Sequence, residues 1–477
     1  MDLRMSCDES KGHRSGNGRS CSPKPIDHGE LFQEIVKDWW VQMQVKVEKD
    51  IPVVASYDVV VCGGGPAGFI AAIAASREGA KTAIIERYGF FGGMATAGYV
   101  TPISVFSYNG SVNIGGIPWE FVQRLEKMDG ALVEQPLNNV AFDIELYKLC
   151  AQRMVLEAGV DLYMHSYISS VTKVGNTINH VVFENKNGTE AIEGKVFIDC
   201  TGDGDVAHLC GVPMQVWKDA SLQPASMCFV LSGVDTSSAL LSACMHHHLQ
   251  GVNCQCEPVR QKLLEMAGEW KLPTFGGPWF CTVLHDGSVA VNMTRIVTDV
   301  CDNRDFTKAE CRLREDVFTF SKVLRDHFPE FRNCYVASVA VQAGPRESRH
   351  IKGMHEITAE EYLHAVRYED SISRGAHPID IHSAQSDKQT CMFLKKAAYV
   401  PYRALMAEGF PDLLVAGRCL SASKEAFASL RVQASCMGMG QAAGVAAAQS
   451  VKDKVAVQDV DVDRLQSSLR ALGAVLD

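Results

Sequence analysis

The sequence lacks the paired cysteines that most structural metal sites use. Its 17 cysteines are scattered from Cys7 to Cys436 with no CxxC pair, and Cys254 and Cys256 are only two positions apart. Zinc and iron–sulfur centres need clustered ligands, so we expect no metal site. Cysteines within apolar runs usually behave as small buried hydrophobic residues. The pattern predicts reduced thiols in a reducing compartment, and hence a cytoplasmic protein.

The sequence also lacks an excess of basic residues and a long apolar run. It has 46 basic against 56 acidic residues, a net charge of −10. This argues against a nucleic-acid partner, because such a protein needs positive charge to neutralise phosphates. No stretch of about 20 apolar residues is free of glycine clusters and charges, and the N-terminus has no apolar signal-peptide core. We therefore expect no membrane span.

A βαβ pattern begins near residue 57. Residues 57–62 form an apolar run, the alanine-rich segment 69–80 indicates a helix, and residues 81–86 indicate a second strand. The turn before the helix is a GxGxxG motif, which in this context predicts a dinucleotide site on the free N–H groups of the helix. We expect five residues to bind the dinucleotide: Gly63, Gly65, Pro66, Ala67 and Gly68. The first glycine permits the turn, the second a close backbone approach to pyrophosphate, and the third helix–sheet packing.

The residue after the second strand bears on which dinucleotide binds. Glu86 is placed to accept hydrogen bonds from ribose hydroxyls, and its charge disfavours the 2′-phosphate of NADP. NAD and FAD both remain open at this point. Three later features favour FAD: a second glycine pair soon after the acid, an apolar strand ending in a Thr-Gly turn at 196–205, and an apolar strand at 413–417 followed by a helix at 438–450. A helix N-terminus at Gly438 would stabilise negative charge on a reduced flavin.

Five segments carry a resemblance to a known family. They are residues 58–87 (DVVVCGGGPAGFIAAIAASREGAKTAIIER), 91–98 (FGGMATAG), 197–211 (FIDCTGDGDVAHLCG), 344–353 (GPRESRHIKG) and 400–448. Together they resemble FAD-dependent oxidoreductases of the glutathione-reductase fold type, and more closely the FAD-oxidoreductase family, over about residues 50–450. The resemblance implies an FAD enzyme, while the breadth of the family in substrate leaves the reaction open.

The resemblance also implies which residues hold FAD. Beside the glycine turn, it implies contacts from Glu86, Arg87, Gly92, Gly93, Met94, Thr201, Gly202, Asp203, Gly417, Arg418, Gly438 and Gln441. The early members would hold the adenosine and pyrophosphate, and the last four the ribityl and flavin half. Related disulfide reductases have a redox cysteine where this chain has Ala95, so thiol–disulfide chemistry is not expected. No second GxGxxG marks an NAD(P)H domain, and the FGGMATAG loop has no histidine, so we expect non-covalent FAD.

These patterns predict an α/β fold. A Rossmann-like FAD-binding domain, three-layered around a parallel sheet, is expected at 51–215 and 396–460, with an α+β substrate or cap domain inserted at 216–395. Residues 1–25 are expected to be a disordered tail. Residues 26–50 are then an N-terminal extension and residues 461–477 a C-terminal segment. Asn187-Gly188 predicts a hairpin within the first part.

Two segments are candidates for the chemistry. Arg346 and Arg349, three apart, would anchor a carboxylate or oxyanion if they converge. The alternative is a structural Arg–Glu network with Glu347. Asp380 and His382, two apart, point to one face of an extended segment. A histidine held by a carboxylate is a plausible proton acceptor, and the alternative is a satisfied loop histidine.

Two further features receive a plain interpretation. The consecutive histidines 246–248 fit a solvated loop better than a metal site, because neighbours cannot share one helical face. The Gly276-Gly277-Pro278-Trp279 segment predicts a turn, with a substrate lid as the alternative.

Three hypotheses about function follow. The first is an FAD-dependent oxidoreductase that moves a hydride between the flavin and a small organic substrate, as a dehydrogenase or oxidase of a CH–OH or CH–NH group, or in reverse as a reductase of an activated double bond. The second is a non-catalytic FAD-binding sensor or assembly subunit, and the third a flavin enzyme acting on RNA, which the acidic balance disfavours. The electron acceptor is open, and a homo-oligomer is compatible with the sequence.

Overall fold

The structure is a computed structural model that describes residues 45–136, 138–217, 222–245, 256–384, 386 and 388–477. The chain divides into a unit of residues 1–50 and a compact unit of residues 51–477. Residues 45–50 have no regular secondary structure. The predicted tail, most of the N-terminal extension and the histidines 246–248 lie outside the described residues.

The βαβ unit forms as the sequence predicts. The apolar strand β1 (Val53–Cys62) runs parallel to β2 (Thr82–Ile85), and α2 (Pro66–Arg77) connects them. Pro66 stands in the first turn of α2, where a missing N–H costs no hydrogen bond. The helix is almost wholly buried, in keeping with its alanine-rich sequence.

A seven-stranded sheet forms the centre, in the order β7-β2-β1-β10-β9-β8 with β21 paired to β10. Its other strands are β7 (Asp161–Tyr163), β8 (Tyr167–Val174), β9 (Thr177–Asn185), β10 (Gly188–Asp199) and β21 (Leu413–Val415). Strands β7, β2, β1, β10 and β21 are parallel, while β8, β9 and β10 are antiparallel. The predicted hairpin at Asn187-Gly188 is confirmed. Strands from both ends of the chain therefore share one sheet, which places the carboxyl ends of β1, β10 and β21 side by side.

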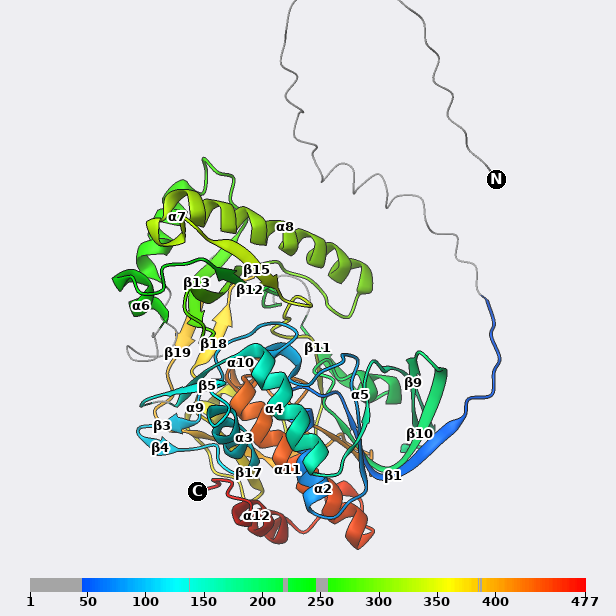
Figure 1. Ribbon diagram of the computed structural model, residues 1–477. Helices are drawn as coiled ribbons and strands as arrows, with labels where there is room; N and C mark the ends of the chain where they lie inside the picture. Colours follow the sequence, from blue (N-terminus) through cyan, green and yellow to red (C-terminus); the bar gives the residue numbers. More distant parts are fainter. Residues whose placement is uncertain (1–44, 137, 218–221, 246–255, 385, 387) are drawn as a thin grey trace, which may run out of the picture. The chain divides into compact units, whose positions relative to one another are not determined.

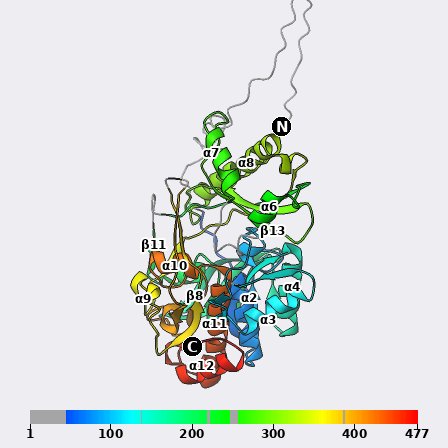
Figure 2. The same cartoon turned by 90° about the vertical axis from the view of Figure 1, so that its left-hand side faces the viewer.

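One face of the sheet is covered by α2 and by the long helix α11 (Gln433–Asp453), which lie against each other (Figures 1 and 2). The contact depends on glycine, because a Cβ at Gly440 would lie 2.1 Å from the carbonyl oxygen of Ala67 and one at Gly444 2.2 Å from that of Ala71. The other face packs on α5 (Asp205–Cys210) and apolar residues of the β8–β10 hairpins. Around α2 and α11 lie α3 (Ile117–Glu126), α4 (Ile144–Glu157) and α12 (Val462–Ala471).

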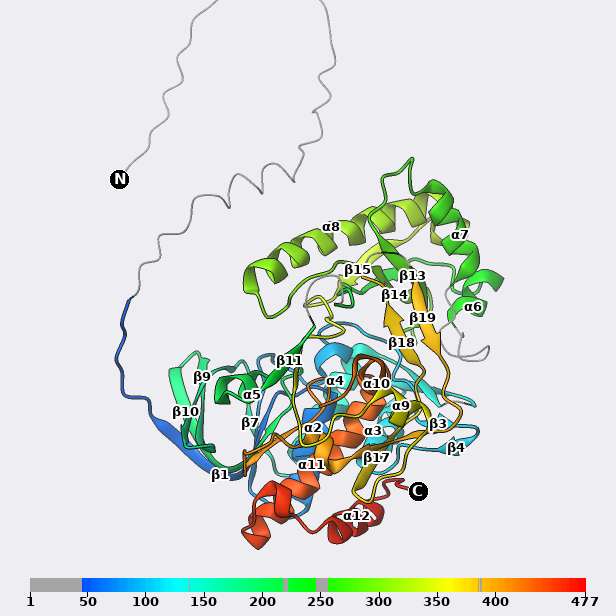
Figure 3. The same ribbon diagram turned by 180° about the vertical axis from the view of Figure 1, so that it is seen from behind.

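A second, four-stranded antiparallel sheet falls within the expected insertion, in the order β13-β14-β12-β15. Its elements are β12 (Phe229–Ser232), β13 (Phe275–Thr282), β14 (Ser288–Thr294), β15 (Tyr335–Val339) and the helices α6 (Ala239–Met245), α7 (Glu257–Met266) and α8 (Asn303–His327). Figure 3 shows α8 running across this sheet. Its apolar side packs there through Leu313, Val317, Phe320 and Leu324.

Short elements join the two sheets. They are β3 (Ser107–Tyr108), β4 (Ser111–Val112), β5 (Ala131–Glu134), β6 (Asn139–Phe142), β11 (Met214–Val216), β16 (Arg349–Ile351), α9 (Ala359–Leu363), β17 (Ser371–Gly375), β18 (Ile379–His382), β19 (Gln389–Met392), β20 (Ala398–Pro401) and α10 (Lys424–Leu430). Strand β17 pairs with β20. A strand from the expected insertion therefore shares a sheet with a strand that follows the boundary expected at 395.

The expectation that all cysteines are reduced thiols is wrong for one pair. Cys244, at the end of α6, and Cys256, just before α7, form a disulfide. Neither the residue spacing nor the surrounding composition signals the pair, because the fold brings the two helix ends together. Most other cysteines among the described residues, such as Cys62, Cys200 and Cys419, are buried free thiols. None of the described helices is long and apolar enough to cross a membrane.

Candidate active site

The glycine turn after β1 has the geometry that a dinucleotide needs. Gly63 has φ +97°, a region that favours glycine. A Cβ at Gly68 would lie 1.8 Å from the carbonyl oxygen of Gly63, which explains the close packing of helix on strand. By contrast, a Cβ at Gly65 would meet no atom nearer than the Cα of Gly93, at 3.9 Å. The space beside Gly65 is therefore open, with the unbonded N–H groups of the first turn of α2 next to it.

Glu86 stands at the carboxyl end of β2 and is buried. Its carboxylate accepts hydrogen bonds from the backbone N–H groups of Gly64, at 2.5 Å, and Tyr88, at 2.9 Å. Burial raises the pKa of Glu86, and these two donors oppose that shift. The next residue, Arg87, donates to Oε1 of Gln342 at 2.9 Å. Glu86 and Arg87 line the cavity described below.

The second glycine pair lies against the first. The N–H of Gly92 donates to the carbonyl of Gly64 at 2.9 Å, and a Cβ at Gly93 would lie 2.9 Å from the Cα of Gly65. Both glycines have positive φ, +111° and +48°. The loop 91–98 is thereby held against the glycine turn that follows β1. The resemblance implies this position for a segment that lies along FAD.

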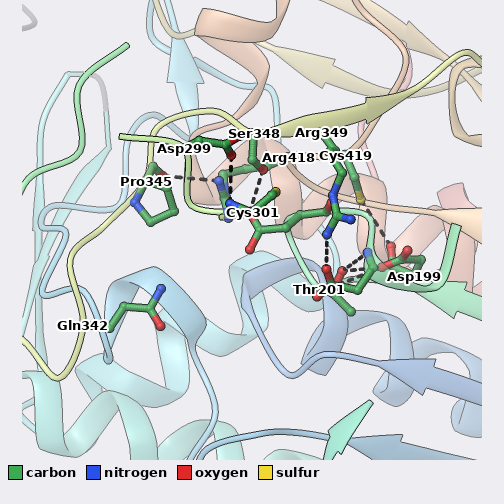
Figure 4. A network of polar contacts seen from close by, with 12 residues as sticks. Asp199, Thr201, Asp299, Cys301, Gln342, Pro345, Ser348, Arg349, Arg418 and Cys419 are labelled. Atoms are coloured by element: carbon green, nitrogen blue, oxygen red, sulfur yellow. Dashed lines mark hydrogen bonds and ion pairs between the residues drawn. The ribbon is translucent and has the colours of Figure 1, made fainter. Parts of the chain in front are cut away.

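The turn after β10 is held by a buried carboxylate, Asp199, which accepts from the N–H and hydroxyl of Thr201 and from the N–H of Ala207 (Figure 4). Asp203 accepts from Arg418 at 3.0 Å and from the hydroxyl of Ser348 at 2.6 Å. Burial acts to raise the pKa of Asp203, but Arg418 and this hydroxyl bring it below its ordinary value.

Arg349, the first residue of β16, contacts the same turn (Figure 4). Its Nε donates to the backbone oxygen of Asp203 at 2.9 Å, and its Nη2 pairs with Asp205. Burial and the neighbouring Asp203 raise the pKa of Asp205 to about 6. The side chain of Arg349 is held by Asp203 and Asp205, which follow β10, and it does not line the cavity. It therefore does not converge with Arg346. The expected pair of substrate-anchoring arginines is therefore not formed.

A cavity of about 290 Å³ begins at the glycine turn and continues past these loops toward the second sheet. It brings together most of the expected residues: Gly63, Gly65, Pro66, Ala67, Glu86, Arg87, Gly93, Met94, Thr201, Gly202, Gly417, Arg418, Arg346, Asp380 and His382. Five expected cofactor residues are not among its lining: Gly68, Gly92, Asp203, Gly438 and Gln441.

The expectation of a helix N-terminus at Gly438 is wrong. Helix α11 begins five residues earlier, at Gln433, and the cavity is lined by Val432, Gln433 and Cys436 from its start. Gly438 instead allows close packing, since a Cβ there would lie 2.4 Å from Oγ of Ser373. Gln441 accepts from the backbone N–H of Ile117 at 2.7 Å. The cluster of small residues marks helix packing, and not a helix start.

Asp380 and His382 share one face of β18, as the extended spacing predicts. Nε2 of His382 lies 3.0 Å from Oδ2 of Asp380, and Nδ1 lies 2.7 Å from Nη2 of Arg295. Because a guanidinium only donates, Nδ1 must accept, so the ring proton is on Nε2 and donates to Asp380. Burial and the positive charge of Arg346 lower the pKa of His382 to about 3. His382 is thus a neutral ring with both nitrogens engaged.

Two arginines of the cavity wall, Arg346 and Arg431, lie near Asp380 and His382. Nη2 of Arg431 lies 3.1 Å from the backbone oxygen of Asp380 and 3.8 Å from its carboxylate. Arg346 donates from Nη1 to the backbone oxygen of Pro224 and to Oγ of Ser226. Burial, Arg431 and Arg295 lower the pKa of Arg346 to about 9. His382 is neutral, so Arg346, Arg431 and Asp380 are charged groups that line this end of the cavity among the described residues.

Sequence reasoning missed several residues of this end. Trp279 lies in β13, where a turn was expected; that interpretation is wrong because the segment pairs with β14 through an irregular register between Phe275 and Trp279. Its ring lines the cavity and contacts His382 edge to face, 5.5 Å between centroids. Arg295 follows β14, Arg431 follows α10, and neither carries a local motif. Their signal is burial of a charge, which only the fold reveals.

Comparison with known proteins identifies the family. The chain matches the FAD dependent oxidoreductase family over residues 58–469, and it belongs to that family. It is 55% identical over 42 residues to a dihydrolipoyl dehydrogenase of Trypanosoma brucei brucei, covering 9% of each chain. It is 26% identical over 205 residues to digeranylgeranylglycerophospholipid reductase 1 of Methanococcoides burtonii, covering 38% of this chain and 45% of that one. The matches thus span less than half of these relatives' length.

Among solved structures, a geranylgeranyl bacteriochlorophyll reductase-like protein from Thermoplasma acidophilum aligns at 13% identity and a TM-score of 0.42, covering 88% of this chain and 83% of that one.

Family membership makes the protein an FAD-dependent oxidoreductase, an enzyme with FAD as cofactor. The residues present fit that cofactor. The open space beside Gly65 is one that a side chain would fill, the first turn of α2 offers unbonded N–H groups, and Glu86 lies at the end of the neighbouring strand. No group of three or more potential metal ligands occurs among the described residues.

Proposed function

We propose that the enzyme oxidises a CH–OH or CH–NH group of a small organic anion, such as a carboxylic acid, at the arginine-rich end of the cavity. The observation that supports it is that Arg346 and Arg431 both line this end of the cavity, beside Asp380 and His382. Arginines bind carboxylates through paired hydrogen bonds.

When bound, FAD, which we propose to be non-covalent, supplies a two-electron acceptor for a hydride. The glycine turn and α2 would hold its pyrophosphate, Glu86 its ribose, and the loop 91–98 would lie along it. Arg346 and Arg431 would orient the anion, and Trp279 would exclude water from the reacting carbon. The free thiols elsewhere in the described chain support a reducing, cytoplasmic setting.

The test is anaerobic mixing of the purified yellow protein with 2-hydroxy and 2-amino acids of two to six carbons. We expect loss of the visible flavin absorbance with one or more acids, and not with the methyl ester of the same compound. Equal reduction by acid and ester would contradict an anionic substrate. If no donor bleaches the flavin, the protein is a non-catalytic FAD-binding subunit or works in reverse.

The reverse reaction is the second candidate, and the similarity to a relative named as a reductase favours it. Its test is reoxidation of the dithionite-reduced protein by an unsaturated carboxylic acid. Rapid reoxidation, together with no bleaching by saturated donors, would identify a reductase of an activated double bond.

A further inference from the structure

The segment between β17 and β18 carries another histidine of the cavity wall, His377, which is 8% exposed. Its Nδ1 lies 2.8 Å from the carbonyl oxygen of Pro378. Because a carbonyl only accepts, Nδ1 carries the ring proton and donates it. The neutral ring therefore keeps its lone pair on Nε2, and the hydrogen bond of Nδ1 is the one that the ring makes among the described residues.

The position of this ring is fixed by neighbours that do not use Nε2. The hydroxyl of Ser429, in α10, donates to the backbone oxygen of His377 at 2.5 Å. The phenol of Tyr362, in α9, lies 2.6 Å from the same hydroxyl and donates to it. Two helices thus hold the backbone at residue 377, while Pro378 holds Nδ1. The free nitrogen is pre-positioned, as a proton-transferring group requires.

His382 differs in this respect. Its Nδ1 lone pair is occupied by the donor from Arg295, and its Nε2 proton by Asp380. To accept a proton, the ring would have to break its bond to a buried guanidinium, which costs the desolvation of that charge. His382 is therefore suited to hold Arg295 and Asp380 in place.

We infer that His377, and not His382, exchanges a proton with the substrate. The inference rests on the proposed function. In the oxidation, the C–H bond breaks and its hydrogen leaves with both electrons as hydride to FAD, the oxidant. The O–H or N–H proton passes to Nε2 of His377, and the remaining electron pair closes the C=O or C=N bond. The imidazolium then releases its proton to water. His382 is a positioning residue.

The charges around His377 set its pH range. Burial lowers the pKa of His377, Asp380 opposes that shift, and Arg431 adds to it. Among the described residues, Arg346 also lines this end of the cavity, and Arg295 lies against the neutral ring of His382. The lone pair is therefore present from below the ordinary histidine pKa of about 6.5 upward. We expect the rate of flavin reduction to be constant at about pH 6.5 and above, and to fall only at a lower pH.

The first test needs no substrate. Diethyl pyrocarbonate acylates imidazole nitrogens that have a free lone pair, so the FAD-loaded protein is treated at pH 7 and its histidines are mapped by mass spectrometry. We expect His377 to react at least about tenfold faster than His382. Faster modification of His382 would overturn the assignment of the free lone pair, and the inference with it.

The second test is anaerobic stopped-flow reduction of His377→Ala by a donor that bleaches the wild type. We expect a loss of about 10²–10⁴-fold in the rate of flavin reduction, an unchanged FAD content, loss of the low-pH limb, and partial rescue by imidazole. His382→Ala should instead raise the donor KM more than it lowers the rate. The matched control is His364→Ala, an exposed histidine at the end of α9 that does not line this cavity.

The outcomes separate the two claims. Wild-type rate and pH profile in His377→Ala would overturn the inference and leave the proposed function intact. A wild-type flavin that neither the acids reduce nor the unsaturated acids reoxidise would remove the proposed function and the inference together.

Discussion

The two ends of the cavity are built in opposite ways. At the end formed by the glycine turn, the structure depends on backbone contacts. Glycines bring chain segments into contact, and carboxylates such as Glu86 and Asp199 accept from backbone N–H groups. At the other end, where we propose that the substrate binds, the wall is formed by side chains, among them Arg346, Asp380 and Arg431. The first end can hold one cofactor common to a family. The second can change its specificity by single substitutions without altering the fold.

The largest effect should come from placing a Cβ where the nucleotide end has none. Gly68→Ala puts that atom 1.8 Å from a backbone oxygen, so we expect a loss of more than about 3 kcal/mol of unfolding free energy, together with the bound FAD. Thermal unfolding and visible absorbance measure this. Gly268→Ala, where a Cβ would meet nothing within 4 Å, is the matched control.

Gly65→Ala separates cofactor space from protein packing. Its Cβ would meet only the Cα of Gly93, at 3.9 Å. We expect unchanged stability of the FAD-free protein and an FAD affinity at least about tenfold weaker, measured by fluorescence titration with FAD. Wild-type affinity would show that the cofactor does not approach this turn.

Arg346 and Arg349 test the boundary between the two ends. Arg346→Met should raise the donor KM by about 10–100-fold with FAD content unchanged, because it removes a charged hydrogen-bond donor. Arg349→Met should leave the donor KM unchanged but cost about 1–3 kcal/mol of unfolding free energy, because Asp205 loses its partner. Steady-state kinetics and urea unfolding measure the two effects. A raised donor KM in Arg349→Met, with an unchanged donor KM in Arg346→Met, would instead place Arg349 at the substrate.

The smallest effect concerns a carboxylate with little backbone support. Asp412, just before β21, accepts from the N–H of Ile178 at 2.6 Å, and burial raises its pKa to about 6 although backbone hydrogen bonds oppose that shift. Since the folded pKa is above the unfolded one, stability is lost as pH rises from about 4 through 6. Asp412→Asn should therefore stabilise the protein by about 1 kcal/mol at pH 7, after allowance for solvent screening, and not at pH 4. Urea unfolding at both pH values decides; destabilisation at pH 7 would show that the charged bond to Ile178 outweighs burial.

The same contrast explains what the sequence could and could not predict. The glycine turn, its helix and the following acid are neighbours in the chain, so their spacing alone predicts both the sheet and the cofactor. Arg295, Arg346 and Arg431 lie far apart in sequence, and only folding brings them together. Trp279 was taken as part of a turn because glycine and proline precede it, although the strand tolerates them through its irregular register. Gly438 was taken as a helix start because small residues serve both for ends and for packing.

The glycine contacts between α2 and α11 have a mechanical consequence. The first turn of α2 and the first residues of α11 both line the cavity, and at Gly440 and Gly444 helix α11 packs directly on the backbone of α2. We therefore expect α2 and α11 to move together as one rigid unit. Room for a bulkier guest must then come from the opposite wall, where β13 carries Trp279, and evolution toward larger molecules in this lineage should show first in that strand.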